Sequence, residues 1–230
     1  MIRKTEGIVI SCIRYQESSV IVKIFTRELG FKSYIVNSVR KAGNKSKIAL
    51  YQPMTMLDLV VYEKEGAGLQ RISEAKTNHP YQLIPFDFRK TSIALFVAEA
   101  ISKSIYENYQ NEWLFDWIKK SLIHLDLPNI ELRHYPHAFL IQLAKFLGFG
   151  PEEVSIFLEE SRTLPFSPEE IPVVSTYLHE LMENSFACKA RVPHLIRRKL
   201  LDYLLDFFSE QLDHNQPWKS ITVIRQIMEE

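Results

Sequence analysis

Four cationic side chains lie close together around a glycine, in the segment 40–47. They are Arg40, Lys41, Lys45 and Lys47. Each Lys or Arg that contacts a phosphate releases condensed counterions, so a flexible loop of this composition can follow a nucleic-acid backbone. A solvated loop on an ordinary protein surface has the same composition. The residues around the segment decide between these two interpretations.

Further cations occur on both sides of this segment in the sequence. Those that we predict to contact DNA together with it are Arg14, Arg27, Lys32 and Arg71. Aromatic residues alternate with them, namely Tyr15, Phe31, Tyr34 and Tyr51. Cations beside aromatic side chains suit single-stranded nucleic acid, because bases of every type stack on an aromatic ring. The alternative for the aromatic residues is packing in the core of a small domain.

The charge of the chain is divided unequally between its two parts. Residues 1–80 contain thirteen Lys or Arg against seven Asp or Glu, a net charge of +6, whereas residues 81–230 have a net charge of −6. The overall charge of zero therefore combines a basic N-terminal part with an acidic C-terminal part. A basic part of this kind indicates a polyanionic partner such as nucleic acid.

The basic part has the pattern of a small β-barrel. Apolar residues recur with a period near two in the runs 7–13, 19–26, 31–38, 54–62 and 69–77. In the second run, Val20, Val22 and Ile24 share one side of the expected strand. The segments 27–30 and 65–68 predict hairpin turns. Five such strands match the five-stranded barrel of the OB fold, although SH3-like barrels have the same size.

From residue 81 onward, the apolar spacing becomes that of helices. Ile93, Phe96, Val97 and Ala100 begin a stripe with spacings of three and four. Gly148 ends the third expected helix, Ser167 is expected to cap a later one, and a long helix is expected over 193–212. The sequence thus predicts an α+β chain, in which an N-terminal five-stranded OB-fold barrel is followed by an all-helical C-terminal domain. We expect DNA binding in domain 1–80 and partner binding in domain 81–230.

The sequence offers no established catalytic or metal-binding motif. It has neither a GxSxG pattern nor a GxxxxGK[ST] phosphate loop. Glu131, His134 and His137 are three residues apart, but a proline lies between the histidines, and we interpret the group as a helix start with surface histidines. Cys12 and Cys188 are too few for a disulfide framework or a four-cysteine zinc site and suit a reducing cytoplasm. We expect no metal and no cofactor, and the residues are compatible with an enzyme but do not support one.

A second basic cluster, Arg197, Arg198 and Lys199, lies within the acidic part. It is suited to hold an acidic peptide or a phosphate, or to form a solvated helix face beside Asp202 and Asp206. No apolar run approaches the roughly 18–20 residues that a membrane span requires. No small-residue cleavage site follows the strand-like N-terminus, so we expect neither a membrane span nor a signal peptide.

Several short motifs follow one another along almost the whole chain. In the basic part they are Thr5-Glu6-Gly7-Ile8-Val9-Ile10, Tyr15-Gln16-Glu17-Ser18-Ser19, Ile24-Phe25-Thr26-Arg27-Glu28-Leu29-Gly30, Val39-Arg40-Lys41, Gln52-Pro53 and Ile72-Ser73-Glu74-Ala75. In the acidic part they are Leu132-Arg133-His134-Tyr135, Phe146-Leu147-Gly148-Phe149, Arg197-Arg198-Lys199-Leu200-Leu201, Trp218-Lys219-Ser220 and Arg225-Gln226-Ile227. In this order the motifs resemble the RecO family, bacterial recombination mediators of DNA repair.

The chain departs from the family pattern in one region. Many relatives carry a four-cysteine zinc module after the motif that ends in Leu-Gly-Phe, whereas residues 151–170 of this chain contain no cysteine. The resemblance therefore implies a variant without zinc. We expect helix packing to replace the module, around Val154, Phe157, Leu158 and Phe166.

The resemblance implies a non-catalytic role in recombinational repair, in the cytoplasm and associated with the nucleoid. RecO proteins bind single- and double-stranded DNA, anneal complementary strands and, with RecR, help to load RecA onto DNA coated by single-stranded DNA-binding protein (SSB). They also contact the acidic, Phe-ended C-terminal tail of SSB. Arg133 matches the arginine at the family's helix start, so the resemblance makes it the candidate cation for the tail carboxylate. A structural ion pair with Glu131 is the alternative.

Two other functions are compatible with the residues alone. A protein–protein adaptor would bind an acidic peptide on its barrel and would not contact DNA, so neutralising the segment 40–47 would leave DNA binding unchanged. A metal-dependent nuclease would use the carboxylates and histidines of the helical part and would require magnesium for turnover of DNA. The order of the family motifs favours the DNA-binding mediator.

Overall fold

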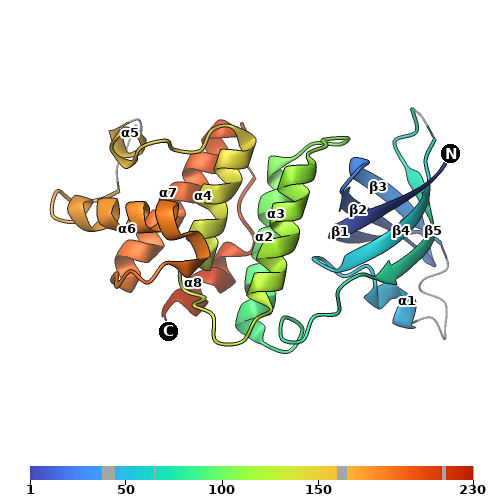
Figure 1. Cartoon of the computed structure of the whole chain (residues 1–230), viewed down its shortest axis with the longest axis horizontal. Helices are drawn as coiled ribbons and strands as arrows, with labels where there is room; N and C mark the ends of the chain where they lie inside the picture. The colour runs from blue at the N-terminus through green and yellow to red at the C-terminus, as the bar shows by residue number, and fades with distance from the viewer. Residues whose placement is uncertain (38–44, 65, 160–164, 214–215, 230) are drawn as a thin grey trace. The chain divides into compact units, whose positions relative to one another are not determined.

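The computed structural model of the chain describes residues 1–37, 45–64, 66–159, 165–213 and 216–229. Its residues form two compact units, Met1–Leu127 and Pro128–Glu230 (Figure 1). The first unit contains the strands of a barrel with helices packed on them, and the second unit is helical. The prediction of an N-terminal five-stranded barrel followed by helices is confirmed.

Five strands close into a barrel in the order β1-β2-β3-β5-β4. They are β1 (Ile2–Tyr15), β2 (Ser19–Thr26), β3 (Gly30–Val36), β4 (Met56–Tyr62) and β5 (Gln70–Thr77). The paired strands run antiparallel except β3 and β5, which are parallel and pair Tyr34 with Gln70 and Ile35 with Arg71. This arrangement is that of the OB fold.

The alternation predicted for β2 forms the centre of the barrel core. Val20, Val22 and Ile24 are at most 1% exposed and pack in one apolar cluster with Leu59 of β4. Gly7 of β1 faces the same interior: a Cβ atom there would lie 2.6 Å from Cγ2 of Ile24 and 2.7 Å from Cδ1 of Leu59. A larger residue at this position would therefore force the side chains of Ile24 and Leu59 to shift within the packed barrel.

Helices of the first unit pack on the barrel. They are α1 (Lys45–Ala49), α2 (Phe88–Ser104) and α3 (Glu112–Leu125). Helix α2 packs on β1, and the ring of Phe115 in α3 lies 5.8 Å from that of Phe25 in β2, edge to face. The predicted apolar stripe of α2 is buried. Asp87 caps α2 by accepting the N–H groups of Arg89 and Lys90.

The turn between β2 and β3 connects the barrel to these helices. Gly30 has a φ of +78°, and a Cβ atom there would lie 2.6 Å from the carbonyl oxygen of Tyr109. The N–H of Phe31 donates to that oxygen at 2.8 Å, and the N–H of Asn108 donates to the carbonyl of Phe31 at 2.7 Å. The segment that follows α2 is thus hydrogen-bonded to the start of β3, and the predicted turn requires its glycine.

Buried polar contacts fasten the start of α2 to the end of α3. Both oxygens of Asp126 accept backbone N–H groups of residues 82–84, at 2.7–2.8 Å. Nζ of Lys90, a residue only 5% exposed, donates to the carbonyls of Leu125 and Leu127 at 2.6 Å each. The ammonium therefore satisfies carbonyls that the end of α3 leaves without helical partners.

The second unit is built from helices. They are α4 (Tyr135–Leu147), α5 (Val154–Glu159), α6 (Ile171–Asn184), the 3₁₀ turn η1 (Ser185–Ala187), α7 (His194–Gln211) and α8 (Ile221–Glu229). Helix α4 packs on α6 and α7, and α8 packs on α7. Gly148 ends α4 with a φ of +86°, as expected. None of the described helices is long and apolar enough to span a membrane.

Two expectations for the second unit have different outcomes. Helix α6 begins at Ile171 with Glu170 as its N-cap, so the prediction that Ser167 caps it was wrong; residues 168–170 form a turn instead. The packing expected around residues 151–170 is present. The ring of Phe157 lies 5.3 Å from that of Tyr203 in α7, and the ring of Phe166 lies 5.9 Å from the same tyrosine.

Candidate nucleic-acid interface

The basic segment 40–47 is only partly within the described residues. Arg40 and Lys41 lie outside them. Lys45 and Lys47 belong to α1, and Lys47, in its last turn, is exposed. The structure thus places one end of the predicted DNA-contacting segment on the barrel, directly before β4 in the sequence.

Two further predicted cations are exposed on the strands. Arg14 lies near the end of β1, and Arg71 lies near the start of β5. Neither forms an ion pair with any residue that the structure describes. Arg71 also lines a hollow of about 490 Å³ between β3, β5 and α1, together with Lys47, Lys76 and the acidic Glu74. These exposed cations are available to an anionic partner.

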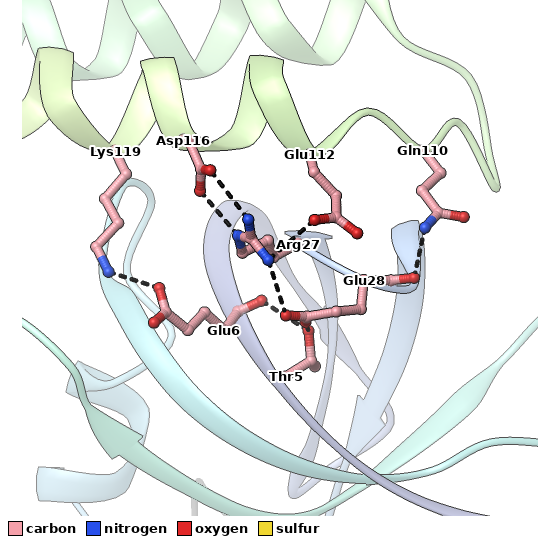
Figure 2. A network of polar contacts seen from close by, with 8 residues as sticks. All are labelled: Thr5, Glu6, Arg27, Glu28, Gln110, Glu112, Asp116 and Lys119. Carbon is pink, nitrogen blue, oxygen red and sulfur yellow. Dashed lines mark hydrogen bonds and ion pairs between the residues drawn. The ribbon is translucent and has the colours of Figure 1, made fainter.

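Arg27, at the turn between β2 and β3, is surrounded by carboxylates (Figure 2). Its Nε and Nη2 donate to the two oxygens of Asp116 at 2.9 and 3.1 Å. Its Nη1 lies 2.9 Å from Oε2 of Glu112 and 3.5 Å from Oε1 of Glu28. The hydrogen bond with Asp116 raises the pKa of Arg27 and lowers the pKa of Asp116. The guanidinium is therefore already held by three carboxylates of the protein.

Neighbouring contacts extend this network along α3 (Figure 2). Nζ of Lys119 donates to Oε2 of Glu6 in β1 at 2.5 Å. Nε2 of Gln110 donates to the backbone carbonyl of Glu28 at 2.7 Å, and the hydroxyl of Thr5 donates to the Glu28 carboxylate. Ion pairs and hydrogen bonds thus join this side of the barrel to α3.

Lys32 in β3 also has an acidic partner. Its Nζ forms an ion pair with the carboxylate of Glu63, and its side chain is only 14% exposed. The N-terminal ammonium of Met1 donates to the backbone carbonyl of Glu63 at 2.7 Å. Lys32 is therefore less accessible to an external phosphate than Arg14 or Arg71.

The interleaved aromatic residues are mostly buried, Tyr34 and Tyr51 in the barrel core and Phe31 on the outer side of β3. Phe31, Tyr34 and Tyr51 are at most 5% exposed, whereas Tyr15 is 39% exposed. For the first three, the structure agrees with the alternative of core packing, so they cannot stack on a base. Tyr15 alone of these four residues presents a substantial part of its ring to solvent.

In the second unit, Arg133 lines a hollow of about 620 Å³. Its Nε and Nη2 donate to the two oxygens of Glu131 at 2.9 and 2.6 Å, and its backbone N–H donates to Oε1 at 3.1 Å. The hydrogen bonds from Arg133 lower the pKa of Glu131 to about 2. The ion pair considered for Arg133 is therefore present. Lys189, Arg191 and Arg197 also line the hollow, which leaves an excess of positive charge there.

His134, the N-cap of α4, and His137, within α4, are buried, so the prediction that these histidines lie on the surface was wrong. His134 is 3% exposed, and its Nδ1 lies 2.7 Å from the hydroxyl of Tyr177. His137 is fully buried, and its Nε2 lies 2.8 Å from the carbonyl oxygen of Arg197. Burial lowers the pKa of both, that of His137 to about 3. Among the described residues, no three His, Cys, Asp or Glu side chains gather in a metal-binding arrangement.

The second basic cluster does not form one solvated face. Arg197 is 6% exposed, and its Nη1 donates to the carbonyl of Val192 at 2.6 Å. Nζ of Lys199 lies 2.8 Å from both oxygens of Glu170. Arg198 is exposed. Only part of this cluster is therefore open to an external ligand.

Sequence reasoning missed the carboxylates that hold Arg27. Glu112 and Asp116 are four residues apart in α3, so they lie on the same face of the helix. In the sequence, this spacing predicts an acidic face on the helix, but it does not indicate which residue that face contacts. Their basic partner is 89 residues from Asp116, and no local pattern connects the two.

Comparison with known proteins matches both parts of the chain to one family. Residues 1–81 match the family model "Recombination protein O N terminal", and residues 85–220 match "Recombination protein O C terminal". A protein of Flavobacterium johnsoniae named DNA repair protein RecO is 34% identical over 235 residues, which cover 97% of this chain and 98% of the relative. Proteins of the same name from Flavobacterium psychrophilum and Azobacteroides pseudotrichonymphae are 32% and 26% identical, over 97% and 100% of this chain.

Proposed function

Because the chain belongs to the RecO family of DNA repair proteins, we propose that it is a recombination mediator that binds DNA and does not transform it chemically. Its barrel binds single- and double-stranded DNA and promotes annealing of complementary strands. Together with RecR, it loads RecA onto single-stranded DNA coated by SSB. It acts in the cytoplasm, at the nucleoid.

The observation that carries the DNA-binding proposal is the division of the barrel cations into two sets. Arg14, Lys47 and Arg71 are exposed and form no ion pair among the described residues, whereas Arg27 and Lys32 are held by carboxylates. A phosphate competes poorly for a guanidinium that three carboxylates surround, as at Arg27, or for an ammonium that is paired and only 14% exposed, as at Lys32. We therefore assign the DNA path to the first set with the segment 40–47, and leave Arg27 and Lys32 out of it.

Annealing places two physical demands on such a protein. It must reduce the repulsion between the phosphates of two strands, and it must leave the base edges free to pair. A set of exposed cations on an open barrel surface meets the first demand, because each phosphate contact releases counterions. The division into a DNA-binding domain 1–80 and a partner-binding domain 81–230 is part of this proposal.

Fluorescence anisotropy with a labelled single-stranded oligonucleotide across a salt series tests the assignment. Changing Arg14, Lys47 and Arg71 to Gln should weaken binding to all sequences and reduce the slope of log affinity against log salt by about 0.7 for each phosphate that the variant no longer neutralises. Lys120→Gln, an exposed cation of α3, is the matched control and should leave the slope unchanged. An unaltered slope in the triple variant would refute the assignment, and absence of binding at low salt would favour the adaptor.

For the SSB tail, we propose the hollow at Arg133 as the binding site. The excess of positive charge from Lys189, Arg191 and Arg197 suits an acidic segment that ends in a carboxylate. The adjoining hollow, which includes Pro172 and Val173, offers an apolar surface for the terminal aromatic ring. Arg133→Gln should lower the affinity for a labelled tail peptide at least about tenfold while DNA binding is retained. An unchanged peptide affinity would exclude Arg133 from the site.

A further inference from the structure

A continuous row of outward side chains crosses all five strands of the barrel. The strand registers pair Ile13 with Ile21, Ile21 with Ile35, Ile35 with Arg71, Arg71 with Tyr62, and Tyr62 with Ile2. Directly paired residues lie on the same side of a sheet, so each member of this row neighbours the next. We call these six residues the belt.

The belt lies on the outside of the barrel. Ile2, Ile13 and Tyr62 are 59%, 55% and 49% exposed. Ile21 and Ile35 are half-buried, and Arg71 is exposed. The residues next to them along the strands, such as Val20, Val22, Tyr34 and Val61, point inward and are at most 1% exposed. Five apolar side chains therefore form one connected row, which winds round the closed barrel from one end of β1 to the other.

A second outward row of the same barrel shows what normally covers such residues. Ile8 pairs with Phe25, and Phe25 pairs with Phe31. These three residues are at most 3% exposed, and the ring of Phe115 in α3 packs against Phe25. The chain thus covers one apolar row with its own helix, whereas the belt keeps large exposed fractions. Connected apolar side chains on a surface indicate a binding site.

Charge around the belt identifies the occupant. Arg71 is a member of the belt. Lys4 and Lys23 lie two residues from Ile2 and Ile21 in their strands, so they share the side of the belt, and Lys64 lies two residues after Tyr62, just past the end of β4. None of these four cations has an ion pair among the described residues. An apolar row bordered by cations complements single-stranded nucleic acid, whose bases are apolar on their faces and whose backbone is anionic.

We propose that the belt is the base-contacting path for single-stranded DNA, an inference that rests on the DNA-binding function proposed above. Base faces lie on the isoleucines and on the Tyr62 ring, and phosphates lie against the bordering cations. Contact through the face leaves the edge of each base free to pair, as annealing requires. Five steps between strands at about 4.8 Å give a path on the order of 24 Å, which suits the roughly 4–16 nucleotides of one OB fold.

The belt distinguishes single strands from duplexes. In a duplex the base faces are stacked inside the helix, so duplex DNA reaches only the cations. Loss of a belt side chain should therefore weaken binding of single strands alone. Loss of Arg71 should weaken binding of both forms, because its contact is with the phosphate backbone.

Anisotropy titrations with a labelled single strand and with the matching duplex test this inference. Tyr62→Ser and Ile13→Ser should each lower single-strand affinity at least about fivefold, leave duplex affinity within about twofold and leave both salt slopes unchanged. Tyr62→Trp should retain single-strand binding. Leu95→Ser, which removes a 46% exposed side chain of α2, is the control and should change neither affinity. Arg71→Gln should lower both affinities and both salt slopes.

The outcomes separate the belt from the DNA-binding function itself. If the wild-type protein binds neither DNA form, the proposed function is refuted, and the proposal for the belt is refuted with it. Wild-type protein that binds both forms, with belt variants that change neither affinity or change both equally, would overturn the belt alone. Ile13 and Tyr62 lie on different strands and are largely exposed, so either variant decides the question if the other does not fold.

Discussion

Arg27 and Asp116 face each other through two parallel hydrogen bonds, from Nε and Nη2 of the guanidinium to the two carboxylate oxygens (Figure 2). The pair joins the turn between β2 and β3 to the middle of α3. Glu112 contributes a second carboxylate to the same guanidinium at 2.9 Å. A residue whose type and position in the sequence suggest a phosphate contact thus has a structural role in holding a helix on the barrel.

The first prediction concerns this structural role. Arg27→Gln should lower the midpoint of thermal unfolding, because it removes the bidentate pair and the cation that lies between Asp116 and Glu112. It should change single-strand DNA affinity by less than about twofold, since an engaged guanidinium contributes little to phosphate binding. Arg71→Gln is the comparison and should lower the affinity several-fold. A large loss of DNA affinity in a folded Arg27→Gln protein would show that Arg27 contacts DNA and would contradict the prediction.

The second prediction concerns the buried ammonium of Lys90. Lys90→Met keeps the unbranched chain up to the ε position but removes the donor to the carbonyls of Leu125 and Leu127. Leaving these carbonyls without a partner should lower the free energy of unfolding by about 3 kcal/mol. Urea unfolding monitored by fluorescence measures the change. Lys120→Met, at an exposed position of the same helix hairpin, should cost less than about 0.5 kcal/mol; equal effects would show that the ammonium contacts are unimportant.

The third prediction concerns pH and the buried His137. Its pKa is about 3 in the folded protein, below its ordinary value near 6.5. Between these pH values, the unfolded chain binds a proton that the folded chain does not, so stability falls as the pH decreases from 6.5 toward 3. From pH 7 to pH 5, His137 alone should lower the free energy of unfolding by about 2 kcal/mol.

His137→Gln tests this contribution, because an amide can still donate to the carbonyl of Arg197 but does not titrate. As the pH falls from 7 to 5, the free energy of unfolding should decrease more for the wild type than for the variant. The lowered pKa of His134 remains in both proteins and cancels in the comparison. A difference that is constant between pH 7 and pH 5 would contradict the prediction.

Much of the architecture could be predicted from local patterns. The alternation of Val20, Val22 and Ile24 predicts both the strand and its buried face, because the side-chain period of a strand is two. Gly30 marks the turn, because its φ of +78° and its contact with Tyr109 exclude a side chain. The sequence places the start of α6 too early, because Ser167 and Pro168 resemble a helix start, while the chain makes a turn before Ile171.

The sites were harder to predict, because they depend on contacts between distant residues. The ion pairs of Arg27 form because α3 packs against the turn between β2 and β3. No residue near Arg27 in the sequence indicates this packing. The belt requires the registers of all five strands at once, since a shift of one residue in any pair would move its members to the other face. The burial of His134 and His137 depends on the packing of α4 against α6 and α7, which is not visible in a short segment.

The last prediction concerns the hollow at Arg133. Glu131 occupies the guanidinium of Arg133 with both carboxylate oxygens, so the tail carboxylate proposed to bind there must displace it or share the cation. Glu131→Gln should therefore increase the affinity for the labelled SSB-tail peptide about three- to tenfold, the range expected for relief of one partly exposed ion pair. A peptide with an amidated C-terminus should gain much less, because it lacks the carboxylate that replaces Glu131.

Glu180→Gln provides the matched control for this experiment. Glu180 lines the adjoining hollow and accepts the N–H of Lys189 at 3.3 Å, so the change removes the same charge nearby without freeing Arg133. It should change peptide affinity by less than about twofold, because charges that are not in direct contact are screened by salt. If Glu131→Gln lowers the affinity instead, Glu131 orients Arg133 for the ligand and does not compete with it. Equal gains from both variants would mean that only the overall charge of the hollow matters.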